Sequence, residues 1–132
     1  METIHPQAIR EAFQARGVAL NPPATEDSIA RLRSWAGGNL QSYFVQMLRE
    51  FDGFSDRDFE EQSFVSVWSA ERALAHDWTQ PPMLAFSDWS LSAMVFGFDP
   101  SSNGPIISIE DARIVAPTYA DFWPRLLSDS LF

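Results

Sequence analysis

The chain has 132 residues, of which 18 are acidic and nine are basic, so its formal charge is −9 at neutral pH. All nine basic residues are arginine, and the acidic balance argues against a nucleic-acid binder, which would normally carry a basic face. The lack of cysteine excludes disulfides and thiol chemistry. No apolar run approaches the ~20 residues of a membrane helix and no secretory signal is visible, so we expect one soluble, cytoplasmic domain over residues 1–132.

Two amphipathic helices are predicted near the N-terminus. Pro6 to Arg16 begins with a proline suited to the first helical turn and is followed by Gly17, a natural stop. Thr25 is a good N-cap for the second helix. Glu26 and Asp27 follow it in the first turn, where the helix dipole favours negative charge.

A third helix is predicted after Asn39, its candidate cap, because large apolar residues recur at helical spacing from Tyr43 to Phe51. The helix should stop at Asp52–Gly53. Between Glu50 and Glu61 six residues are acidic and one is basic, a net charge of −5 (one minus six). We interpret this segment as an exposed acidic loop.

The second half of the chain is expected to form a sheet. Ser63–Trp68 is a predicted strand, and a short helix should follow at Ala70–His76. Met83–Phe86 and Leu91–Phe98 are predicted strands separated by a polar turn at Ser87–Ser90. The later strand is apolar on both faces, which favours a central position with cover on both sides.

Two further strands and a helix are expected after this pair. Pro105–Glu110 should return antiparallel, Arg113–Ala116 reads as a short edge strand, and Thr118 with Asp121 resembles a capping box before a C-terminal helix. The predicted class is α+β: a single domain with a mixed or mainly antiparallel sheet of about four to six strands, backed by N-terminal helices and a C-terminal helix.

Residues that carry enzyme chemistry are sparse. There is no Gly-x-Ser-x-Gly elbow, and the only histidines, His5 and His76, lie at predicted helix ends, where capping and dipole roles are commoner than catalysis. The histidines give no zinc signature. Asp56–Glu60 has the start of a calcium-loop spacing but lacks the glycine and the later acid, so divalent binding there stays open. We predict no enzyme activity, no cofactor and no metal.

The five tryptophans divide into two groups. Trp35, Trp68 and Trp123 fall within predicted regular elements, which favours core positions. Trp78 and Trp89 have polar neighbours in the sequence. Aromatic residues in loops are favoured binding anchors, and the alternative is that these two fold back over the core.

The order of several short motifs resembles the SUKH superfamily, bacterial toxin-immunity proteins related to a yeast regulator of cell-wall synthesis. Pro23–Leu32 reads Pro-Ala-Thr-Glu-Asp-Ser-Ile-Ala-Arg-Leu and resembles the family's Pro-Ala-Thr-Glu-Glu-x-Ile helix. Leu40–Leu48 and Phe51–Gly53 resemble a following helix that ends at Asn-Gly. Trp68–Glu71 and Tyr119–Leu127 fit the later part, so the resemblance spans about residues 20 to 128.

This chain departs from the family pattern at three places. Leu40–Gln41 stands where the family often has Leu-Pro, and Asp52–Gly53 stands for the usual Asn-Gly. Asp88–Ser90 replaces a Gly-Gly-Asp-like turn between the central strands. The last difference falls where the family's sheet is most recognisable.

The resemblance implies a single α+β domain without enzymatic activity that binds and neutralises a cognate toxin, often a nuclease or deaminase. The acidic composition suits a partner with a basic surface, with no role for nucleic acid or membrane. We expect a monomer or a weak homodimer. Acidic residues would steer the encounter and a tryptophan would anchor the partner. The predicted partner-binding residues are Asp56, Asp58, Glu60, Glu61, Asp88 and Trp89.

Three alternatives remain at this point. The same fold can serve as an intracellular scaffold or regulatory module with a partner other than a toxin. A small enzyme would need carboxylate chemistry from Asp88 with Asp99 or Glu71. The acidic composition can also serve solubility alone.

Overall fold

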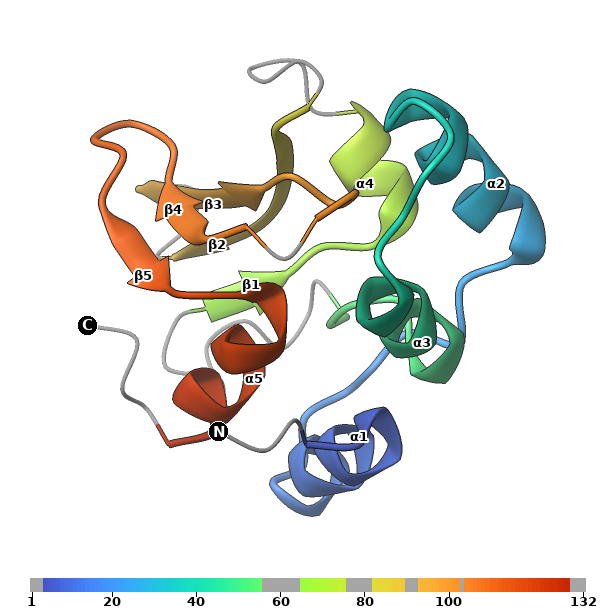
Figure 1. Cartoon of the computed structure of the whole chain (residues 1–132). Helices are drawn as coiled ribbons and strands as arrows, with labels where there is room; N and C mark the ends of the chain where they lie inside the picture. The colour runs from blue at the N-terminus through green and yellow to red at the C-terminus, as the bar shows by residue number, and fades with distance from the viewer. Residues whose placement is uncertain (1–3, 56–64, 76–81, 90–92, 103, 129–132) are drawn as a thin grey trace.

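A computed structural model of the chain describes residues 4–55, 65–75, 82–89, 93–102 and 104–128. Within these residues five helices and one five-stranded antiparallel sheet form a single small domain, which confirms the predicted α+β class (Figure 1). The elements are α1 (Pro6–Ala15), α2 (Glu26–Trp35), α3 (Ser42–Glu50), β1 (Val65–Val67), α4 (Ala70–Ala75), β2 (Leu84–Trp89), β3 (Met94–Phe98), β4 (Ile106–Ser108), β5 (Ile114–Ala116) and α5 (Tyr119–Leu127).

The helix boundaries follow the predicted capping residues in three of four cases. The Thr25 hydroxyl accepts the backbone N–H of Ser28 at 3.1 Å, and the Thr118 hydroxyl accepts that of Asp121 at 3.1 Å. Gly17 follows α1 with a φ of 81°, as a helix stop requires. The prediction for α3 is wrong: its N-cap is Gln41, whose side-chain amide donates to a carbonyl beyond β3.

The sheet is a simple meander in the order β1-β2-β3-β4-β5, with every neighbouring pair antiparallel. The central position predicted for β3 is confirmed. The turn predicted at Ser87–Ser90 is wrong for its first three residues, because β2 continues through Trp89. Asp88 lies opposite Ser66 of β1 and Val95 of β3, so backbone pairing on both sides outweighs the turn preference of Ser-Asp.

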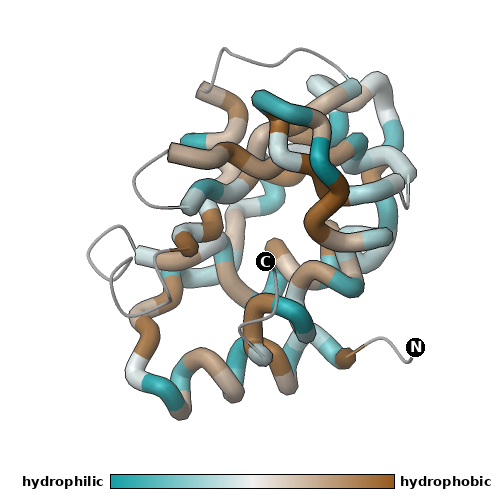
Figure 2. Tube along the Cα trace, turned by 90° about the vertical axis from the view of Figure 1, so that its left-hand side faces the viewer, coloured by the Kyte–Doolittle hydropathy of each residue, from teal (hydrophilic) through white to brown (hydrophobic). Residues whose placement is uncertain are grey.

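The two faces of the sheet are covered differently. The main core lies between one face and the helices, and α5 and α3 bring the side chains that fill it. Tyr119 of α5 stacks on Phe98 of β3 with ring centroids 4.8 Å apart. The opposite face carries a small separate cluster of Trp68, Ala85 and Val95. Figure 2 shows brown and teal bands alternating along the helices, as expected when each turns one side to the core.

Gly53, three residues after the end of α3, lies against the backbone of the β1–α4 connection. Its φ is 76°, and a Cβ built on it would lie 2.6 Å from the carbonyl oxygens of Val67 and Trp68. The backbone N–H of the next residue, Phe54, donates to the Val67 carbonyl at 2.8 Å. This residue therefore needs glycine both for its backbone conformation and for space.

We expect Gly53→Ala to destabilise the protein far more than Gly37→Ala. Gly37 has a similar φ of 85° but no atom within 4 Å of its Cβ position. Both variants pay the left-handed strain of about 1–2 kcal/mol, and only Gly53→Ala adds overlap with backbone, worth about 1–3 kcal/mol or more. Urea unfolding measures both, and equal losses would contradict the steric role.

Candidate functional site

The structure places two of the six predicted partner-binding residues. Asp88 and Trp89 are neighbours in β2. Asp56, Asp58, Glu60 and Glu61 lie outside the described residues, as does Trp78.

Asp88 is buried beneath α4 instead of lying on an exposed turn. Only 3% of the residue is exposed, and its Oδ2 lies 3.3 Å from Nη2 of Arg72. The Arg72 guanidinium also lies over the Trp68 ring, 4.6 Å from its centroid. Because a buried carboxylate is costly without a partner, the ion pair contributes to the docking of α4 on β2. The exposed part of this cluster belongs to Arg72, whose side chain is 41% exposed.

Sequence reasoning missed Arg72. The signal that was present is the spacing of Trp68 and Arg72, four residues apart around the start of a short helix. Trp68 precedes α4 by two residues and Arg72 lies within its first turn, and this short separation lets the cation lie over the aromatic ring. The partner carboxylate of Asp88 comes from a different element, so sequence spacing gives no indication of it.

Trp89 is half-buried and packs against the main core. It lies opposite Val65 of β1 and Met94 of β3. Trp89 was expected either to anchor a partner or to fold back over the core. Its position favours packing over the core, with part of the side chain still exposed. Trp68 and Trp123 are buried as predicted, while Trp35 is half-buried.

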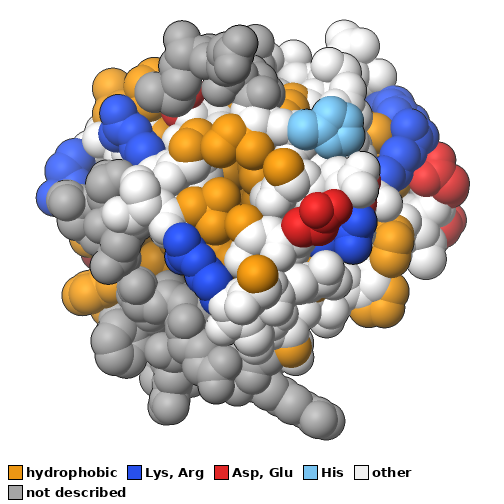
Figure 3. Space-filling view, turned by 90° about the horizontal axis from the view of Figure 1, so that it is seen from below, with side chains coloured by type: hydrophobic (Ala, Val, Ile, Leu, Met, Phe, Trp, Pro, Cys, Tyr) orange, Lys and Arg blue, Asp and Glu red, His pale blue; other side chains and the backbone are white. Residues whose placement is uncertain are grey.

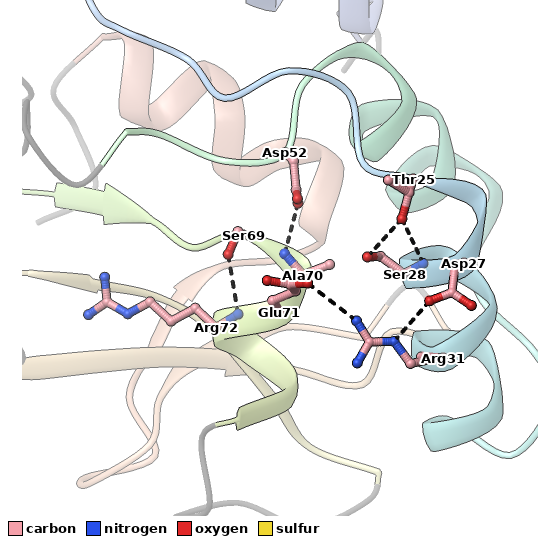
Figure 4. A network of polar contacts seen from close by, with 9 residues as sticks. All are labelled: Thr25, Asp27, Ser28, Arg31, Asp52, Ser69, Ala70, Glu71 and Arg72. Carbon is pink, nitrogen blue, oxygen red and sulfur yellow. Dashed lines mark hydrogen bonds and ion pairs between the residues drawn. The ribbon is translucent and has the colours of Figure 1, made fainter.

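A polar network joins α2 to α4 on the surface (Figure 4). Arg31 of α2 lies 3.5 Å from the carboxylate of Asp27 and 3.6 Å from that of Glu71 on α4. All three side chains are at least half exposed, so these contacts add little stability in water. In the same view Arg72 extends away from this network.

Asp52 connects the end of α3 to the start of α4. Its Oδ1 accepts the backbone N–H of Ala70 at 2.8 Å, which caps α4 from outside the helix (Figure 4). Burial raises the pKa of the Asp52 carboxyl above its ordinary value of 3.8, while the Ala70 hydrogen bond acts in the opposite direction. The Asp52 backbone accepts from the Asn21 side chain at 2.9 Å. This one residue thereby ties three segments together.

The carboxylates considered for an enzyme each have a separate local contact. Asp88 pairs with Arg72, Glu71 pairs with Arg31, and Asp99 accepts from the backbone N–H and the hydroxyl of Ser101 at 2.9 and 2.6 Å. The core contains a cavity of about 20 Å³ lined mainly by apolar side chains, which is room for a single water.

The described part of the chain contains no group of three or more histidine, aspartate or glutamate side chains that is able to hold a metal ion. None of its helices has the length and apolar character needed to cross a membrane. Comparison with known proteins finds no family profile that matches the chain and no curated protein with significant similarity to it.

We expect Asp52→Asn to remove a pH dependence of stability. The raised pKa means that the folded protein holds this proton to a higher pH than the unfolded chain, so the wild type loses stability as pH rises from 3.8 through the folded-state pKa. The asparagine variant keeps an oxygen for the Ala70 N–H but does not ionise. Urea unfolding at about pH 4 and about pH 7 measures this effect. The free energy of unfolding of the wild type, relative to that of Asp52→Asn, should be lower at the higher pH.

Asp52→Ala is the control for the cap itself. It removes the acceptor and should lose about 1 kcal/mol relative to Asp52→Asn at both pH values. A difference between the wild type and Asp52→Asn that does not change with pH would contradict the assigned titration.

Arg72→Met should lower the free energy of unfolding by about 1–3 kcal/mol, because it removes the guanidinium from a carboxylate that is 3% exposed. Adding Asp88→Asn to this variant should recover part of the loss. Arg33→Met is the matched control, since Arg33 is exposed on α2, and should stay within about 0.5 kcal/mol of the wild type. Chemical denaturation measures all three, and similar losses at the two arginines would exclude the buried pair as the cause.

Proposed function

We propose that this chain is a non-enzymatic immunity protein of the SUKH kind, which binds and neutralises a cognate toxin in the cytoplasm of the bacterium that makes it. The observation that carries the proposal is the Asp52–Gly53 junction. Asp52 and Gly53 resemble the family's Asn-Gly. Asp52 caps α4, and Gly53 packs on the Val67–Trp68 backbone that leads into α4. A two-residue match is weak support by itself, and the specific structural role of Asp52 and Gly53 strengthens it.

The order of the elements also supports the proposal. The motif helices at Pro23–Leu32 and Leu40–Leu48 correspond to α2 and α3, and Tyr119–Leu127 corresponds to α5. An antiparallel sheet backed by helices at both ends of the chain is what the resemblance implies. The family's Gly-Gly-Asp-like turn is replaced in this chain by Asp88–Ser90. The first two of these residues belong to β2, which extends to Trp89, three residues further than predicted.

Charge indicates the kind of partner. The chain carries 18 acids against nine arginines, and four of the acids are clustered at Asp56, Asp58, Glu60 and Glu61. Enzymes that act on nucleic acids present basic surfaces to their substrates. An acidic segment attracts such a surface over long range and, once docked, covers it against the substrate.

The roles of the predicted contact residues differ within this proposal. The four clustered acids steer the encounter, and the exposed part of Trp89 supplies apolar contact. Asp88 acts indirectly, because its carboxylate is buried and orients Arg72. Arg72, whose side chain is 41% exposed and oriented by Asp88, then presents a positioned cation at the surface, a feature that favours one partner over others by charge placement.

The proposal predicts that the gene directly upstream in the native genome encodes the toxin, and coexpression with that gene is the test. The wild-type chain should restore colony formation and bind the purified toxin. Asp56→Arg with Glu60→Arg should slow association about tenfold or more and flatten its dependence on salt, because steering is lost. Glu11→Arg with Asp111→Arg makes the same change in net charge at exposed residues elsewhere and should keep most of the rate.

Two results would overturn the proposal. One is a wild-type chain that neither binds the neighbouring toxin nor restores growth. The other is a captured native partner that is not a toxin, which would assign the chain to scaffolding or regulation. Equal slowing by both double variants would leave neutralisation standing but remove the acidic cluster as the contact surface.

A further inference from the structure

The strand β5 (Ile114–Ala116) lies at one edge of the sheet, whose order runs from β1 to β5 among the described residues (Figure 1). An edge strand turns backbone groups away from the sheet, where a strand of another molecule can pair with them. Ile114 is 62% exposed, and no other large apolar side chain in the described residues is exposed. This edge therefore has two features that favour pairing between molecules: a strand without an outer neighbour in the described sheet, and an exposed apolar side chain.

The opposite edge of the sheet, at β1, is covered by the backbone of the chain itself. The N–H of Phe54 donates to the carbonyl of Val67, the last residue of β1, at 2.8 Å. Phe54 also forms an isolated β-bridge with Leu20, so a segment from the N-terminal half of the chain lies beside the end of β1. One edge of the sheet is thus closed by main-chain contacts.

At β5 a comparable contact comes from a helix side chain. The register between β4 and β5 shifts within β5, so Val115 stands as an extra residue between two paired ones. Such a bulge leaves the extra residue without a partner in the neighbouring strand. The Val115 carbonyl accepts a hydrogen bond from Nη1 of Arg125 at 2.8 Å. A charged donor therefore occupies the main-chain acceptor in the middle of this edge strand.

Arg125 reaches β5 because α5 follows the strand closely. Thr118 caps α5 two residues after β5 ends, and the helix packs against that strand. Arg125 lies in the last turn of α5 and is half-buried. Seen from below, where α1 and α5 lie, arginine side chains are spread among hydrophobic ones (Figure 3). A cation beside apolar surface discourages another chain from covering that surface, because the cation would lose its hydration.

We propose that Arg125 guards the edge of β5 against pairing with a second copy of this chain. Its guanidinium occupies the Val115 carbonyl, which an added strand would use as an acceptor, and its charge resists burial under that strand. A second copy is the relevant occupant, because every molecule carries the same edge and two such edges can pair antiparallel about a two-fold axis. Without the guard, the exposed Ile114 adds apolar contact between the joined edges. The inference is independent of toxin neutralisation, since it concerns the chain alone.

The test is sedimentation velocity of the full chain at concentrations up to about 1 mM, where even a weak pairing is populated. The wild type should sediment as a monomer throughout this range. Arg125→Met removes the guanidinium but keeps a long side chain, and its sedimentation coefficient should shift toward that of a dimer as the concentration rises. Arg33→Met, which removes an exposed arginine of α2, makes the same change in net charge and should stay monomeric.

A second substitution separates edge pairing from misfolding. Adding Ile114→Lys to Arg125→Met should restore the monomer, because paired copies would bring like charges together at one edge, while urea unfolding shows no matching recovery of stability. The proposal is overturned if Arg125→Met loses stability but stays monomeric, which is the result for a purely structural contact. Equal association of Arg33→Met, or a dimer that persists with Ile114→Lys, would also exclude the guard. So would a wild-type dimer that Ile114→Lys dissociates, since the edge would then be open.

Discussion

The packing of Gly53 on the Val67–Trp68 backbone is the constraint on which the other parts of this structure depend. It sets α3 against the start of α4, because the neighbouring Asp52 reaches the first turn of α4 only from that position. It also fixes β1, whose Val67 carbonyl is taken by Phe54. β1 is the first strand of the sheet and α4 packs on β2. The contact of Gly53 with the connection between β1 and α4 therefore positions α3 relative to the sheet.

The meander then gives its two faces different tasks. The face toward α3 and α5 is filled by aromatic rings and supplies most of the core. The other face has a small cluster and a buried ion pair between Asp88 and Arg72. A charge pair in such a place adds specificity of docking more readily than stability, since desolvation offsets much of its attraction. The position of α4 is therefore set by the Asp52 hydrogen bond to Ala70, by the Arg72–Asp88 ion pair and by the burial of Ala70 and Ala73 in the main core.

Acidic residues outnumber basic ones two to one in this chain, with 18 aspartates and glutamates against nine arginines. The net charge of −9 sets the sign of the long-range field of the chain, and the proposed function takes a partner with a basic surface to be the one that this field attracts.

The sequence by itself determined the element types, their order and two of the caps. Periodicity and capping are local properties, so Thr25, Thr118 and the apolar character of β3 were sufficient for these predictions. It also determined the charge imbalance, from which a partner with a basic surface is predicted. Only the tertiary structure decided that β2 continues through Asp88, that this carboxylate is buried against Arg72, and that Arg10 pairs with Glu50. These features depend on contacts between residues far apart in the chain, and no local pattern encodes which distant partner will satisfy a strand edge or a charge.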